Sequence, residues 1–163
     1  VIDRALFSLK SNDFPIYYLS PRGFKLDAQI SNSISKLDGM TLVCGKYEGV
    51  DERVIKHYNM IEISIGDYIL SGGDLAAMVL IDSVVRCLPN VLGNPLTLND
   101  ETFTNHLLEY PLYTQPREWK NYKVPDVLLS GDHKKIKNWK IKQSEDITMK
   151  RRPDLWKKYL KLK

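Results

Sequence analysis

At 163 residues, with 43% hydrophobic content, the chain is long enough for one domain with a small appendage, and it has no apolar run near the roughly 20 residues that a membrane-spanning helix needs. Its two cysteines, Cys44 and Cys87, are too few for a disulfide framework, and no signal peptide is visible, so we expect a cytoplasmic protein without a metal site. The net charge of +4 is unevenly distributed along the chain. Residues 1–116 hold 9 Lys and Arg and 14 Asp and Glu, whereas residues 117–163 hold 15 Lys and Arg and 6 Asp and Glu. The positive charge of the C-terminal segment favours a polyanionic partner.

The N-terminal part of the chain alternates between predicted helices and strands. In chain order we expect the end of a helix over 3–10, a strand over 14–19, a helix with its apolar face at Leu26, Ile30, Ile34 and Leu37, a strand over 40–44, a helix over 51–58 and extended chain over 61–70. Pro21-Arg22-Gly23 is expected to end the first strand. Strands separated by helices predict an α/β fold with a parallel sheet.

Two adjacent glycines, Gly72 and Gly73, precede an apolar helix that we predict over 74–88. Glycine lets the backbone come close to a group that a side chain would exclude. The helix is apolar on most sides, so it must be buried in a core or against a partner subunit.

Ligands of open parallel sheets bind beyond the carboxyl ends of the strands. The candidate binding loops are therefore residues 19–23, 45–49 and 64–74. The glycine pair alone is a weak signal, because it fits neither a dinucleotide-binding motif nor a P-loop.

The C-terminal part is typical of a small helical unit with a basic surface. Residues 93–104 have the composition of a linker, and the two prolines of 110–116 discourage regular structure. Ser130 is expected to cap a basic helix, and Pro153 to lie in the first turn of a last helix. That last helix would pack through Leu155, Trp156, Tyr159 and Leu160.

The basic residues 117–163 carry interleaved aromatic residues, a composition that suits a folded RNA with accessible phosphates and unstacked bases. We expect the phosphate contacts to come from lysines of the basic helix, namely Lys134, Lys135, Lys137, Lys140 and Lys142. A solvated lysine-rich surface is the alternative. Core positions are favoured over base stacking for Trp119, Trp139 and Trp156, because a small helical domain needs large apolar residues.

Several longer motifs together resemble one enzyme family. "YLSPRG", "LVCGKYEGVDERVI", "SIGDYILSGGDLAAMVLIDSVVR" and "LPNVLG" closely resemble the bacterial tRNA (guanine-N1)-methyltransferases, the TrmD family of the SPOUT class. "LLEYPLYTQP", "VPDVLLSGDHKKIKNWK" and "RRPDLW" are similar to the second domain of the same family. The resemblance covers essentially the whole chain in the right order, and it implies methylation of N1 of guanosine 37 in tRNA.

The resemblance also implies a fold and an assembly. It predicts a SPOUT-type parallel sheet with a deep C-terminal trefoil knot, and a homodimer whose active sites are shared across the interface. It places a methyltransferase domain at residues 1–93, a linker at 94–104 and a basic helical tRNA-binding domain at 105–163. Family members carry some dozens of residues before this point, including a first strand and a glycine-rich loop near the guanosine, so we expect the chain to be a fragment.

The methyl donor implied by the resemblance is S-adenosyl-L-methionine, with its adenine against the backbone of residues 64–70. The residues that the resemblance assigns to the donor are Pro21, Tyr47, Glu48, Gly49, Ser64, Ile65, Gly66, Tyr68, Leu70, Gly72 and Gly73. A Mg²⁺ requirement is implied as well, although the sequence shows no cage of oxygen ligands for it.

Methylation at N1 of guanine requires a base, because that nitrogen carries a proton near neutral pH, and a positive group that stabilises charge developing on O6. The resemblance assigns these tasks to Glu101 and Arg86, with a glutamate at the position of the family's aspartate. Asp100 is the alternative base, and Arg86 has an alternative role as the partner of Asp82 one helical turn earlier.

Two other functions stay open at this point. A ribose 2′-O-methyltransferase of the same class would need no linker carboxylate. A tRNA-binding fragment without catalysis would bind the methyl donor and transfer nothing.

Overall fold

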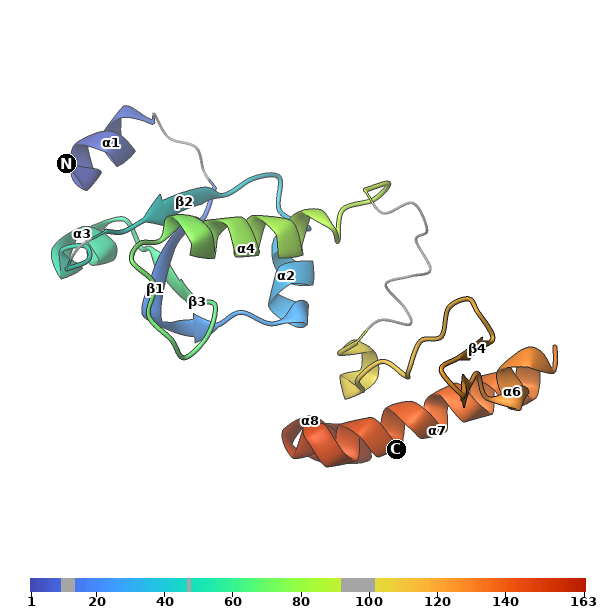
Figure 1. Ribbon diagram of the computed structural model, residues 1–163. Helices are drawn as coiled ribbons and strands as arrows, with labels where there is room; N and C mark the ends of the chain where they lie inside the picture. The colour runs from blue at the N-terminus through green and yellow to red at the C-terminus, as the bar shows by residue number, and fades with distance from the viewer. Residues whose placement is uncertain (10–13, 47, 92–101) are drawn as a thin grey trace. The chain divides into compact units, whose positions relative to one another are not determined.

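The computed structural model describes residues 1–9, 14–46, 48–91 and 102–163, and the chain divides into two compact units, residues 1–93 and 94–163. The first unit is built on a parallel sheet of three strands, in the order β2, β1, β3 (Figure 1). These strands are β1 (Ile16–Lys25), β2 (Thr41–Cys44) and β3 (Ile61–Ser64), and β1 pairs in parallel with both neighbours. The predicted α/β fold with a parallel sheet is therefore confirmed.

The helices of the first unit are α1 (Ile2–Ser8), α2 (Ala28–Ile34), α3 (Glu52–His57) and α4 (Asp74–Val85). Asp27 caps α2, because its carboxylate accepts a hydrogen bond from the Ile30 amide at 2.9 Å. The helix ends at Ile34, so the expectation that Leu37 continues its apolar face was wrong, and Leu37 is 42% exposed.

Successive residues of β1 point to opposite faces of the sheet, and both faces are covered. On one face a cluster joins the sheet to α2 and α4; its buried members are Tyr17, Leu19, Ile34, Ile63, Ala76, Ala77, Leu80 and Val84. On the other face Tyr18 packs with Val43, Ile55 and Met60, and residues of α1 and α3 cover this second cluster. The sheet is thus the middle layer of the first unit (Figure 1).

The pairing of β1 with β3 is interrupted in the middle. Leu19 and Phe24 both pair with Ile63, so the four residues Ser20–Gly23 bulge out of the ladder. Pro21-Arg22-Gly23 therefore interrupts the pairing without ending the strand, which corrects the prediction. A Cβ atom on Gly23 would overlap the backbone of Glu62 and Ile63, so only glycine fits where the chain returns to β3.

The second unit contains η1 (Thr104–His106), the hairpin of β4 (Glu118–Trp119) and β5 (Tyr122–Lys123), and the helices α6 (Asp126–Leu129), α7 (His133–Arg151) and α8 (Pro153–Leu160). Asp132 caps α7 in place of Ser130, because its carboxylate accepts from the Lys135 amide at 3.1 Å. Pro153 begins α8 as predicted, and Leu155 is buried. Leu160 is 51% exposed, so it does not belong to the packed face.

A buried threonine connects the helices of the second unit to the segment before the hairpin. Thr148 is fully buried; its hydroxyl donates to the Ser144 carbonyl at 2.6 Å and accepts from the Leu108 amide at 2.8 Å. Within the described residues, no helix has the length and apolar character needed to cross a membrane.

Candidate active site

A cavity of about 350 Å³ lies at the carboxyl ends of the strands of the first unit. Its wall is made by the bulge of β1, by the loop after β2, and by the loop between β3 and α4. These are the three loops at which the sequence places a ligand. The volume falls within the range of small-molecule sites, roughly 300 to 1,000 Å³.

Most residues assigned to the methyl donor line this cavity. The lining includes Pro21, Glu48, Gly49, Ser64, Ile65, Gly66, Tyr68, Leu70, Gly72 and Gly73, whereas Tyr47 lies outside the described residues. Sequence reasoning assigned no individual role to other lining residues, among them Ser20, Arg22, Lys46 and Ile69 inside the three predicted loops and Tyr18 and Ala76 outside them. Several of these residues lie next to assigned residues in the chain, and this adjacency could have identified them as lining residues.

The loop after β3 folds tightly on itself. The hydroxyl of buried Ser64 donates to the Gly66 carbonyl at 3.0 Å and accepts from the Gly66 amide at 3.2 Å. Gly66 has a φ of 155°, and the Tyr68 hydroxyl donates back to the Ile65 carbonyl at 3.3 Å. A side chain on Gly66 would collide with the Tyr68 ring. These contacts hold this cavity-lining loop in one shape.

The two adjacent glycines meet different surroundings. The Gly73 amide donates to the Gly45 carbonyl at 2.9 Å, and a Cβ atom on Gly73 would lie 2.9 Å from the Cα atom of Cys44. A Cβ atom on Gly72 would find its nearest neighbours, atoms of the Asp74 and Lys46 side chains, at 3.6 Å, which is ordinary contact. Glycine is therefore needed at position 73 because one loop approaches another there. The sequence had suggested that the glycines allow approach to a ligand.

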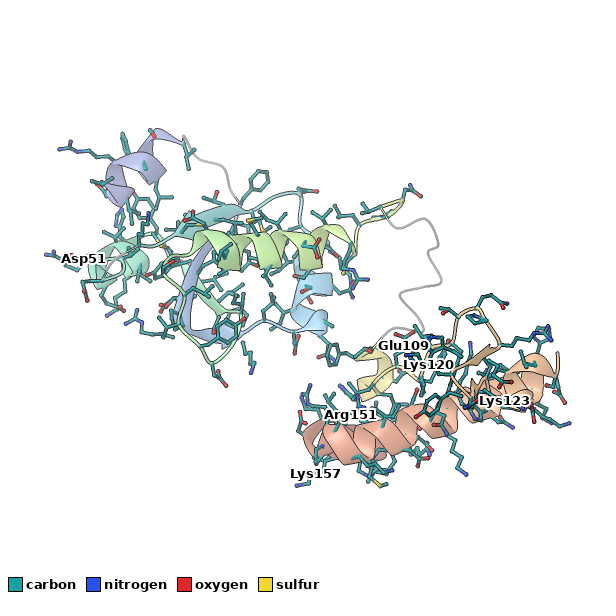
Figure 2. The ribbon with its side chains drawn as sticks, in the orientation of Figure 1. Asp51, Glu109, Lys120, Lys123, Arg151 and Lys157 are labelled. Atoms are coloured by element: carbon teal, nitrogen blue, oxygen red, sulfur yellow. The ribbon has the colours of Figure 1, made fainter. Side chains whose placement is uncertain are left out.

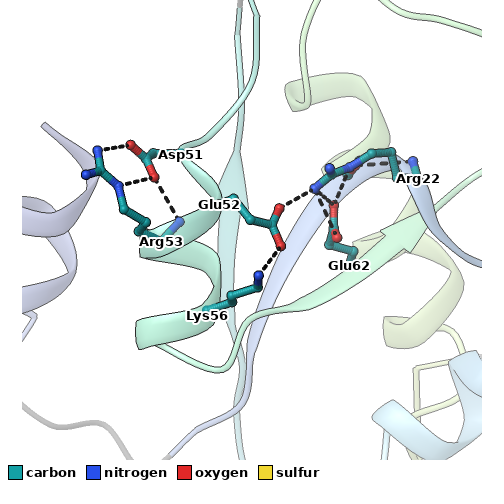
Figure 3. Close-up of polar contacts among 7 residues, drawn as sticks. Arg22, Asp51, Glu52, Arg53, Lys56 and Glu62 are labelled. Carbon is teal, nitrogen blue, oxygen red and sulfur yellow. Dashed lines mark hydrogen bonds and ion pairs between the residues drawn. The ribbon is translucent and has the colours of Figure 1, made fainter.

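Arg22 connects the bulge of β1 to β3 and to α3 (Figure 3). Its guanidinium donates to Glu62 on β3 at 3.1 Å and to Glu52 on α3 at 3.1 Å, and Lys56 pairs with Glu52 at 3.6 Å. The hydrogen bonds that Arg22 donates to Glu52 and to Glu62 raise the pKa of Arg22. Because Arg22 also lines the cavity, this network holds one wall of the site against the body of the unit.

The loop after β2 ends at Asp51, the N-cap of α3. The Asp51 carboxylate accepts from the Arg53 amide at 2.8 Å and pairs with the Arg53 guanidinium at 2.7 Å (Figure 3). The side-chain hydrogen bond from Arg53 lowers the pKa of Asp51 to about 2. The cap therefore stays charged through the neutral range, and the geometry gives Asp51 a role in ending the loop.

The two predicted catalytic residues lie away from the cavity or outside the described residues. Arg86 is the C-cap of α4 and is exposed, with its amide donating to the Asp82 carbonyl at 3.2 Å. It is not among the residues that line the cavity. Glu101 and the alternative base Asp100 lie outside the described residues. The catalytic assignment consequently stays a prediction.

Four of the five lysines assigned to phosphate are exposed on α7; these are Lys134, Lys135, Lys137 and Lys142. Lys140 differs, because it is half-buried and its ammonium donates to the Tyr110 hydroxyl at 2.7 Å. The expectation that all three tryptophans favour the core was wrong for Trp119, which is 59% exposed. Among the described residues, no group of three or more His, Cys, Asp and Glu could hold a metal ion.

Comparison with known proteins gives a consistent result. A family model described as tRNA (guanine-1)-methyltransferase TrmD matches residues 1–158. The tRNA (guanine-N(1)-)-methyltransferase of Pelagibacter ubique is 54% identical over 161 residues, which are 99% of this chain and 71% of the relative. Relatives of the same name from Ruegeria pomeroyi and Rhodospirillum rubrum are 50% and 51% identical, over 91% and 98% of this chain. The chain spans 61% of the length of the first and 67% of the second.

Proposed function

The chain belongs to the tRNA (guanine-1)-methyltransferase family, and on this premise we propose that it transfers a methyl group from S-adenosyl-L-methionine to N1 of guanosine 37 in tRNA. The observation that carries the proposal is the cavity at the carboxyl ends of the strands, which is lined by ten of the eleven residues that the family resemblance assigns to the methyl donor. The donor, when bound, supplies an electrophilic methyl group. Residues of the chain must bind the donor, accept the proton from N1 and stabilise the charge that develops on O6.

The cavity suits such a donor in size and chemistry. Its wall between β3 and α4 includes residues 64–66 and 68–70, and the family resemblance places the adenine against the backbone of residues 64–70. Glu48 adds a carboxylate that favours a cationic sulfonium. The packed glycines keep side chains out of the loop contacts and so preserve the shape of the cavity.

The chemistry at guanine is assigned to Glu101 and Arg86. Glu101 would accept the N1 proton, and the Arg86 guanidinium would stabilise negative charge developing on O6. Arg86 lies directly after the end of α4. One side of α4 is apolar and exposed, and its residues are Leu75, Met78, Val79, Ile81 and Val85.

An exposed apolar helix face of this extent favours a partner subunit, and we assign it to a homodimer in which Arg86 completes the site of the other copy. Sedimentation equilibrium at micromolar concentration tests the assignment. A dimer is expected, and a monomer under these conditions would contradict it.

The remaining family traits complete the proposal. Residues 1–93 form the methyltransferase domain with a trefoil knot, residues 94–104 the linker, and residues 105–163 the tRNA-binding domain of a cytoplasmic enzyme. A Mg²⁺ requirement stays a prediction.

Product analysis tests the proposed function. The chain is incubated with S-adenosyl-L-methionine and unmodified tRNA, both alone and joined to the part of the Pelagibacter ubique relative that lies outside the 71% matched by this chain. We expect 1-methylguanosine at position 37 by mass spectrometry of digested tRNA, and none with a tRNA that carries adenosine there. A 2′-O-methylated nucleoside, or no product from the extended chain, would contradict the proposal.

A further inference from the structure

The hairpin of β4 and β5 places two aromatic rings on one face. Trp119 and Tyr122 pair directly across the hairpin and flank a two-residue turn, Lys120–Asn121, with φ values of 48° and 68°. Two central residues with positive φ are the signature of a type I′ turn, whose twist matches that of the strands. Because residues directly opposite share a face, the rings stack with centroids 6.4 Å apart and planes at 28°.

Both rings are exposed. Trp119 is 59% exposed and Tyr122 is 75% exposed. The Lys120 ammonium lies 4.9 Å from the centroid of the Trp119 ring. Exposed aromatic rings beside a cation offer a surface on which a nucleobase can stack and a positive charge for its phosphate.

The charges around the hairpin select the class of ligand. Arg117 precedes it, and Lys120 and Lys123 lie within it, whereas Glu118, its one carboxylate, pairs with Lys123 at 3.8 Å. Figure 2 labels both lysines in this part of the second unit. Residues 117–163 as a whole hold 15 Lys and Arg against 6 Asp and Glu. An aromatic pair in such a basic field fits a nucleic acid better than an apolar protein surface.

We propose that Trp119 and Tyr122 form a stacking platform for an unpaired base of tRNA, with Lys120 on an adjacent phosphate. This inference rests on the proposed function for its ligand and adds the place of contact. Bases inside an RNA duplex are already stacked and inaccessible, so only an unpaired nucleotide of a loop or a single-stranded end can occupy the platform. The lysines of α7 would then contribute phosphate affinity without reading unpaired bases.

Binding of fluorescently labelled tRNA to the full chain, measured over a series of salt concentrations, tests the platform. Trp119→Ala is expected to weaken binding by about 10-fold, since stacking of one base on an aromatic side chain contributes roughly 1 to 3 kcal/mol, and to leave the salt dependence unchanged. Trp119→Phe keeps a ring and should bind within about threefold of wild type. Lys120→Gln should reduce the slope of log affinity against log salt by about 0.7 to 0.9.

Two controls separate the platform from general effects. Phe7→Ala removes another exposed ring, 82% exposed in the first unit, and should bind tRNA as wild type does. A blunt RNA duplex without unpaired nucleotides should bind Trp119→Ala and wild type equally. The inference is overturned if Trp119→Ala binds tRNA as tightly as wild type, if it loses duplex binding to the same extent, or if it changes the oligomeric state instead.

The outcome also distinguishes this inference from the proposed function. Loss of tRNA binding in Trp119→Ala, together with no methyl transfer by the extended wild-type chain, would support the platform and contradict the enzyme assignment. Methyl transfer by wild type, with unchanged tRNA binding in Trp119→Ala, would contradict the platform alone. Wild type that does not bind tRNA would contradict both.

Discussion

Glu101→Gln is expected to lower the rate of methyl transfer by about 10²- to 10⁴-fold, the usual contribution of a positioned general base. Glutamine keeps the size of the side chain and removes only its ability to accept the proton from N1. The affinity for S-adenosyl-L-methionine should stay unchanged, because the cavity is built from the loops of the first unit. Single-turnover methyl transfer and calorimetric titration with the donor measure the two quantities.

The neighbouring carboxylate provides a matched control for this prediction. Asp100→Asn should retain the rate of methyl transfer within about threefold, since only one carboxylate is needed as the base. The defect of Glu101→Gln should also shrink as pH rises, because N1 then loses its proton to solvent without help. Full activity of Glu101→Gln combined with a large loss in Asp100→Asn would transfer the role to Asp100, and full activity of both variants would contradict general-base catalysis from this segment.

Gly23→Ala is expected to destabilise the first unit by about 3 kcal/mol, and to lower its unfolding midpoint by about 12 °C or more. The added Cβ atom would overlap the backbone of Glu62 and Ile63, and backbone cannot move aside as the end of a flexible side chain can. Relief would require the bulge of β1 to leave β3, which would also displace Pro21 and Arg22 from the cavity. Affinity for the methyl donor should therefore fall together with stability.

Gly72→Ala is the matched control for Gly23→Ala. It adds the same methyl group to another cavity-lining glycine, where the nearest atoms would be 3.6 Å away. Its unfolding free energy, measured by calorimetry, should stay within about 0.5 kcal/mol of wild type. Equal destabilisation by the two substitutions would contradict the packing described for the bulge.

The local sequence pattern was enough to predict the helices and strands whose signals lie within a few adjacent residues. The alternation of apolar strands and helices predicted the parallel sheet, and Pro153 marked the start of α8. The exceptions depend on contacts distant in sequence. The bulge of β1 exists because Phe24 pairs again with Ile63, and Gly73 must be glycine because Cys44 lies against it. Neither contact can be read from residues adjacent in the chain.

The candidate site likewise has some features that the sequence predicted and others that it could not predict. The positions of the three binding loops followed from the rule for parallel sheets, whereas the residues assigned to the methyl donor came from a family resemblance. Arg22 lies in one of the predicted loops, but its pairing with Glu52 and Glu62 could not be predicted, because they are 30 and 40 residues away in the chain. The prediction of a core position for Trp119 was wrong. A large apolar ring usually lies in the core, but here the turn Lys120–Asn121 holds it on the surface.

Crystals of the chain soaked with S-adenosyl-L-methionine provide the most direct test of the central claim. The donor is expected in the cavity between the β1 bulge, the loop after β2 and the loop that follows β3, with its adenine against residues 64–70. Density for the donor at any other place, or a cavity without it at saturating concentration, would contradict the claim.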